Sequence, residues 1–126
     1  MSTVTGPSPR NTRIRELFAA VDSMKFEEFG AFLTDEVTFV MGNNPPLHGR
    51  DAVREGSQAF MASIASIHHT IDDWFERGHE VLVRVRVTVG RRDGEQVTVP
   101  AVVHFEERDA GITRYQIYVD MGPVFA

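Results

Sequence analysis

The chain has 126 residues, of which 42% are hydrophobic and 25% are charged, a composition typical of an ordinary globular protein. Its formal net charge of −5 argues against a general binder of nucleic acid or of an anionic membrane, because both need clustered positive charge. The absence of cysteine excludes disulfides, thiolate metal sites and thiol nucleophiles. No apolar run approaches the roughly 20 residues that span a bilayer, and we expect a cytoplasmic protein. A disordered lead, residues 1–10, is expected to precede a single domain, residues 11–126.

The N-terminal third of the sequence has helical periodicity. Asn11 or Thr12 is the expected N-cap of a first helix. A shorter second helix restarts at Ser23, and a third opens at Gly49. Four apolar residues of the first helix have the i, i+3, i+4, i+7 spacing that forms one face: Ile14, Leu17, Phe18 and Val21.

The remaining pattern is that of β-strands. Residues 37–41 form a short β-prone run, and from residue 68 onward apolar side chains recur at every second position. Asp93-Gly94 predicts a hairpin turn, and Pro100 predicts an edge position or a bulge because proline lacks the N–H donor. The four long strands that we expect are residues 68–75, 79–89, 95–107 and 112–120.

This order of elements predicts an α+β fold. Three N-terminal helices are expected to cover the concave face of a strongly bent, mixed or antiparallel sheet. A bent sheet with helices on one side encloses a cone, and such cones bind small, mostly apolar molecules in their mouths.

Three stretches give the element order a family resemblance: Gly42–Val53 before the third helix, Asp93-Gly94 with Pro100 in the sheet, and Tyr118–Phe125 at the end. With them, residues 11–126 resemble the nuclear-transport-factor-two-like cone and, within it, the SnoaL-like group of polyketide-cyclase relatives. The resemblance implies an acid/base role for the aspartate of the closing Tyr-x-Asp motif, which is Asp120 in this sequence.

Two other groups of relatives imply different sites. The limonene-epoxide-hydrolase relatives add an arginine and a second aspartate on the long middle strand, where this sequence offers Arg84 or Arg86 but no aspartate. The ketosteroid-isomerase relatives place a base aspartate on the short strand, and residues 37–41 contain no acid. Neither a two-carboxylate hydrolase nor a steroid isomerase is therefore expected.

The expected site lies on the face of the last strand that carries Asp120. An isolated carboxylate is costly to bury, so Asp120 is paired, wet or protonated. Strand parity places Tyr118 on the same face and His104 across the hairpin, and together these groups would move protons. The alternative is a structural ion pair between Arg86 and Asp120, with His104 hydrogen-bonded into it.

Two sets of site residues follow from this assignment. Placing the site on the Asp120 face requires the arginine-bearing face of the 79–89 strand to point into the cone. The alternative is the inverted pairing, in which the valines of this strand point inward and its arginines are exposed. The expected catalytic residues are Asp120, His104 and Tyr118, and the expected substrate-binding residues are Arg86, Trp74, Phe18, Met41, Phe60 and Val102.

The other ionisable side chains form no metal pattern. The five histidines have neither His-x-x-x-His spacing nor a facial triad, so no metal and no cofactor are expected. His68 and His69 are adjacent and point to opposite faces, and a satisfied core or surface histidine is expected for each. Asp72 and Asp73 likewise point to opposite faces, so we do not expect them to act as a carboxylate pair.

The expected function is acid/base chemistry without a cofactor, of the cyclase, isomerase, hydrolase or dehydratase type, on a small apolar substrate in the cone. One alternative is a ligand-binding module without catalysis, and another is an accessory or interaction subunit of the same fold. We also expect a homodimer through the sheet, since outward-facing valines of the 79–89 strand would need cover.

Overall fold

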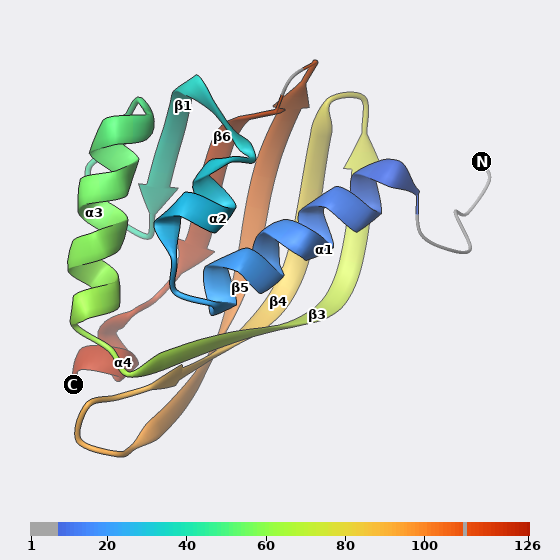
Figure 1. Ribbon diagram of the computed structural model, residues 1–126. Helices are drawn as coiled ribbons and strands as arrows, with labels where there is room; N and C mark the ends of the chain where they lie inside the picture. The colour runs from blue at the N-terminus through green and yellow to red at the C-terminus, as the bar shows by residue number, and fades with distance from the viewer. Residues whose placement is uncertain (1–7, 110) are drawn as a thin grey trace.

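The computed structural model describes residues 8–109 and 111–126 as one bent sheet with helices on its concave face (Figure 1). This confirms the predicted α+β class. In chain order the elements are α1 (Pro9–Asp22), α2 (Phe26–Gly30), β1 (Leu33–Met41), β2 (Leu47–His48), α3 (Arg50–Ala62), β3 (Ser66–Arg77), β4 (Glu80–Gly90), β5 (Gln96–Arg108), β6 (Gly111–Val119) and α4 (Gly122–Phe125).

The sheet has the strand order β2-β1-β6-β5-β4-β3. Strands β3 to β6 form an antiparallel meander, whereas β1 pairs in parallel with β6 and carries the short strand β2 at its free edge. The long strands twist and bend, so that the sheet curls around α1, α2 and α3 (Figure 1). The sheet is open between its edge strands β2 and β3, and the helices fill its open side (Figure 1).

Helix α1 begins earlier than predicted. Ser8 is its N-cap, with the Ser8 Oγ accepting a hydrogen bond from the Asn11 N–H at 3.0 Å, and Pro9 occupies the first helical position, which needs no N–H. The prediction of Asn11 or Thr12 as the cap is therefore wrong, and residues 8–10 of the predicted lead belong to the fold. The rest of that lead, residues 1–7, lies outside the described residues. In the described part of the chain, no helix has the length and apolar character needed to cross a membrane.

The concave face of the sheet is its valine-bearing face. All of the alternating valines of β4, from Val81 to Val89, are buried, while the side chains of Arg84 and Arg86 are 59% and 55% exposed. The expectation that the arginine face looks into the cone is wrong, and the inverted pairing is the one that forms. Burying each valine stabilises the fold by about 1.5–3 kcal/mol, whereas a buried arginine needs a charged partner.

A bulge in β3 changes which side chains share a face. Ile71 pairs with Val85 and Asp73 with Arg84, so Asp72 is an extra residue on β3. Both aspartates consequently lie on the outer face, where Asp72 contacts Arg86 and Asp73 contacts Arg84. The prediction that the two aspartates face opposite ways is wrong, because it assumed an unbroken period of two.

Candidate functional site

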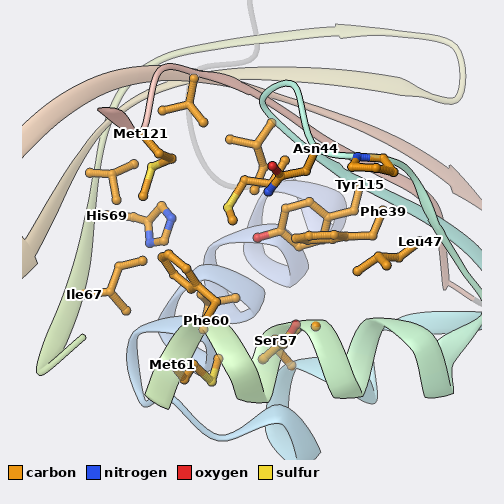
Figure 2. A pocket seen from close by; sticks show the side chains of 18 of the residues that line it. Phe39, Asn44, Leu47, Ser57, Phe60, Met61, Ile67, His69, Tyr115 and Met121 are labelled. Carbon is orange, nitrogen blue, oxygen red and sulfur yellow. The ribbon is translucent and has the colours of Figure 1, made fainter. Parts of the chain in front are cut away.

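A cavity of about 460 Å³ lies between the concave face of the sheet and the helices (Figure 2). Among the described residues no charged side chain lines it, and the few polar groups that they contribute come from Asn44, Ser57, His69 and Tyr115. A cavity of this size and character suits a small, mostly apolar molecule. Most of the wall is apolar and includes Phe39, Met41, Phe60, Met61, Ile117 and Val119.

The most reactive group in the wall is the imidazole of His69. It lies on β3 with the inward parity of Ile67 and Ile71, and its side chain is only 6% exposed. The His69 Nδ1 is 2.6 Å from the Asp22 Oδ1, and the His69 backbone N–H donates to the Asp22 Oδ2 at 3.1 Å. A carboxylate oxygen can only accept, so in the neutral ring Nδ1 carries the proton and Nε2 keeps a free lone pair.

The position of Asp22 follows from the end of α1. Asp22 is the last residue of that helix, which packs against β3, and β3 is an edge strand with unpaired backbone groups. The Asp22 carboxylate accepts a hydrogen bond from one of these backbone N–H groups and another from the imidazole N–H. One turn earlier, the ring of Phe18 packs on the His69 ring with centroids 4.9 Å apart. The two hydrogen bonds and the aromatic contact fix the imidazole in one orientation.

Tyr115 supplies a second polar group on the opposite wall. It lies on β6, is 2% exposed and packs between Phe39 and Phe105, with ring centroids 5.1 Å and 4.8 Å away. Figure 2 shows its hydroxyl pointing to the part of the cavity that contains His69. Burial, together with the negative charge of Asp22, raises the pKa of Tyr115 well above its usual range, so its hydroxyl stays protonated.

The predicted catalytic residues lie outside the cavity. Asp120 is exposed at the end of the sheet, where its Oδ1 accepts a hydrogen bond from the Gly122 N–H at 2.9 Å. Tyr118 is 54% exposed on the outer face, and His104 lies there too, with its Nε2 2.9 Å from the Glu80 Oε1. The expected grouping of these residues in the cone is therefore wrong, because the sheet face that carries them is the convex one.

The predicted binding residues divide between the cavity and other places. Met41 and Phe60 line the cavity. Arg86 is on the outer face with Asp72, and Val102 pairs with Arg84 on the same face. The two aromatic residues occupy neither place: Phe18 lies behind His69 in the core, and Trp74 packs at the core edge with its Nε1–H donating to the Glu76 Oε2 at 2.6 Å.

Sequence reasoning missed Asp22 and Tyr115 and treated His69 as a core or surface histidine. A signal for Tyr115 exists, because it shares strand parity with Ile117 and Val119, the apolar face that a core should take up. For Asp22 there is none, since its partner is 47 residues away. Among residues 8–109 and 111–126, no three His, Asp or Glu side chains are grouped in a way that would hold a metal ion.

Comparisons with known proteins agree with this architecture. The model of the SnoaL-like domain family matches residues 14–115. The chain is similar to TerC co-crystallised with polyporic acid (18% identity, TM-score 0.82, 94% of this chain and 96% of that chain). It is also similar to an NTF2-like protein of unknown function from Burkholderia pseudomallei K96243 (17%, 0.84, 94% and 96%) and to an LEH-like epoxide hydrolase from M. tuberculosis (17%, 0.76, 90% and 84%). At these identities the likeness shows the fold alone, and no curated protein matches the chain.

Proposed function

The chain belongs to the SnoaL-like domain family, and we propose that it is an acid/base enzyme acting on a small apolar molecule in the cone cavity. His69 is the proposed proton carrier. The observation that supports this most strongly is the part-buried pair of His69 and Asp22, in which the carboxylate holds the Nδ1–H and leaves the Nε2 lone pair for a bound molecule. A base of this kind needs no cofactor to take up a proton.

The pair has the features of a general base. Asp22 fixes the tautomer and the ring orientation, and it stabilises the imidazolium that forms once Nε2 has taken a proton. The mostly apolar wall lowers the polarity around the pair, which strengthens the electrostatic contribution of the carboxylate. A neutral substrate fits best, because the lining, in the part of the chain that the structure describes, offers no charged side chain to pair with an ionic one.

The fold neighbours support a small-molecule ligand. One of them was crystallised with polyporic acid, and another, a hypothetical protein with a ketosteroid-isomerase-like fold from Catenulispora acidiphila, was crystallised with trimethylamine. The second candidate function is a ligand-binding module without catalysis, which uses the same cavity. The two differ in whether His69 transfers a proton or only contacts the ligand.

Homodimerisation through the sheet also belongs to the proposal. The outer face exposes three large apolar side chains, Phe75, Leu82 and Tyr118, and Phe75 pairs directly with Leu82 across β3 and β4. Such exposed apolar groups favour burial against a second copy. The cytoplasmic location and the organisation as a single domain stay predictions.

A Kemp elimination assay tests the enzyme proposal without knowledge of the natural substrate. The probe is 5-nitrobenzisoxazole, a neutral, flat bicycle whose C–H proton is removed by a base while its N–O bond breaks, giving a coloured phenolate. We expect the protein to accelerate this reaction, and we expect His69→Gln to lower the rate by about 100-fold or more.

The matched control is His48→Gln, because His48 is exposed on β2, away from the cavity lining. An unchanged rate in His69→Gln would contradict the role of His69. Binding of the probe without any acceleration by the unaltered protein would favour the ligand-binding module instead.

A further inference from the structure

We propose that His68 is a positioning residue for the base His69 and acts through the Asp22 carboxylate, which lies within reach of both imidazoles. A positive charge at residue 68 weakens His69 as a proton acceptor. This inference rests on the proposed function, because His69 is the proton carrier there. It gives a role to a side chain that lies outside the cavity lining.

The carboxylate of Asp22 contacts two adjacent histidines of β3. The His69 Nδ1 is 2.6 Å from the Asp22 Oδ1, and the His68 Nδ1 is 3.4 Å from the Asp22 Oδ2. Side chains of adjacent strand residues point to opposite faces, so a group lying over one face would reach only one of them. Asp22 reaches both because it lies beside the free edge of β3, where its Oδ2 also accepts the His69 backbone N–H.

The two imidazoles differ in their access to water. The His69 side chain is 6% exposed in the cavity wall, whereas the His68 side chain is 71% exposed. An exposed imidazole exchanges protons with the solvent, and the charge of histidine side chains changes between about pH 5 and pH 8. His68 can therefore gain or lose a positive charge without any change in the cavity itself.

The surroundings of His68 favour a positive charge on it. Asp22 is the last residue of α1, at the negative end of the helix dipole, and the last turn of that helix contains no basic residue. Across the strand pair His68 faces Thr88, which is uncharged. Arg86, two residues before Thr88 on β4, is held by Asp72. The partner for a protonated His68 is therefore the carboxylate of Asp22.

A charge on His68 acts on His69 by compensating this carboxylate. When His69 takes up a proton at Nε2, the negative charge of Asp22 stabilises the imidazolium. A cation paired with the same carboxylate cancels part of that charge, so the imidazolium is stabilised less. Tyr115 also lies close enough to interact with the Asp22 charge, but burial raises the pKa of Tyr115 and keeps it neutral. Protonation of His68 thus makes His69 a weaker base.

Two substitutions at residue 68 test the effect of charge. His68→Lys carries a permanent positive charge and His68→Gln carries none, and the exposed position tolerates both. At pH 8 and low salt we expect His68→Gln to keep the native rate of the Kemp elimination and His68→Lys to lower it about 3- to 10-fold. At pH 5.5 we expect the native protein to be about 3-fold slower than His68→Gln, because a histidine at this position is then charged.

Two further measurements separate an electrostatic effect from a structural one. In about 1 M salt the two variants should differ less than about 2-fold, because the Debye length falls to about 3 Å. Nitrogen NMR, which needs no substrate, should show His69 taking up its second proton at a pH about 0.5 lower in His68→Lys than in His68→Gln. The matched control is His48→Lys, which adds the same charge at an exposed histidine outside the cavity lining and should change neither readout.

The possible failures can be told apart. Equal rates for the two variants, or His69 titrations that coincide, would overturn the inference and leave the acid/base proposal intact. A difference that persists undiminished in high salt would also overturn it, since residue 68 would then act through packing and not through its charge. A native protein without any acceleration would contradict the proposed function, and the NMR titration would then decide alone whether the charge at residue 68 acts on His69.

Discussion

Replacing Asp22 with asparagine tests how the carboxylate acts on His69. In the native protein the carboxylate accepts two N–H groups of His69, one from the ring at 2.6 Å and one from the backbone at 3.1 Å. An asparagine has the same shape but only one oxygen, and its NH2 group is a donor. If the amide oxygen accepts the backbone N–H, the NH2 faces Nδ1 and requires a lone pair there.

The ring can satisfy that requirement by moving its proton to Nε2. The tautomer protonated at Nε2 keeps both hydrogen bonds between residue 22 and His69. The tautomer protonated at Nδ1 leaves one N–H unpaired at a cost of about 1–3 kcal/mol, so we expect the Nε2 tautomer to prevail. The cavity then receives an N–H in place of a lone pair, and the base is lost. The rate of the Kemp elimination should fall by about 100- to 10,000-fold, as for other misoriented catalytic histidines.

The expected loss of stability is small by comparison. Exchanging two hydrogen bonds to a charged acceptor for neutral ones costs about 1 kcal/mol in the free energy of unfolding, or about 4 °C in melting temperature. Asp51→Asn is the matched control, because the Asp51 side chain is 93% exposed and its loss should change the stability by less than about 0.5 kcal/mol. An Asp22→Asn variant that unfolds earlier but retains the full rate would refute the reasoning, since Asp22 would then be structural only.

Three further predictions concern other parts of the molecule. Asp120→Asn should leave the Kemp elimination rate within about two-fold, because Asp120 is exposed outside the cavity lining, and a large loss would restore the role expected from the sequence. Hydrogen bonds from Arg13 and Arg10 hold the pKa of Glu107 below its usual range, so the stability that they add is present above the unfolded carboxyl pKa and is lost as the pH falls through the folded value. Glu107→Gln should thus lower the free energy of unfolding by about 1–2 kcal/mol at neutral pH, and denaturant titrations should show the two proteins converging below about pH 4; a gap that is constant with pH would contradict the ion-pair account. Leu82→Glu should turn the proposed homodimer into a monomer in sedimentation experiments, and a dimer that survives would place the interface elsewhere.

The elements of the fold could be predicted from the sequence because their patterns are local. The alternation of valines in β4 and the hairpin turn at Asp93-Gly94 depend only on neighbouring residues. The strands β4 and β5 and the turn that joins them form where expected. The family resemblance supplied the order in which the elements pack. The prediction of the inward face of β4 was wrong. It gave an expected arginine site more weight than the simpler rule that the apolar face of a strand packs on the core.

The candidate site could not be predicted, because it is made of long-range contacts. The Asp22–His69 pair depends on where α1 ends against the edge of the sheet, and the local sequence around either residue does not predict this contact. The bulge at Asp72 also has no strong local signal, although it decides the faces of Asp73 and Trp74. Packing and register, and not residue type, determine which histidine enters the cavity.

The state of the His69 ring is the most direct test of the central claim. Nitrogen NMR of the 15N-labelled imidazoles at neutral pH reports which ring nitrogen carries the proton, and 5-nitro-1H-indazole serves as an unreactive N–H donor shaped like the Kemp substrate. We predict a protonated Nδ1 and an unprotonated Nε2 for His69, with the Nε2 signal shifting as the indazole binds and the His48 signals unchanged. A His69 ring protonated at Nε2, or an Nε2 signal that does not move while the indazole binds, would contradict the account.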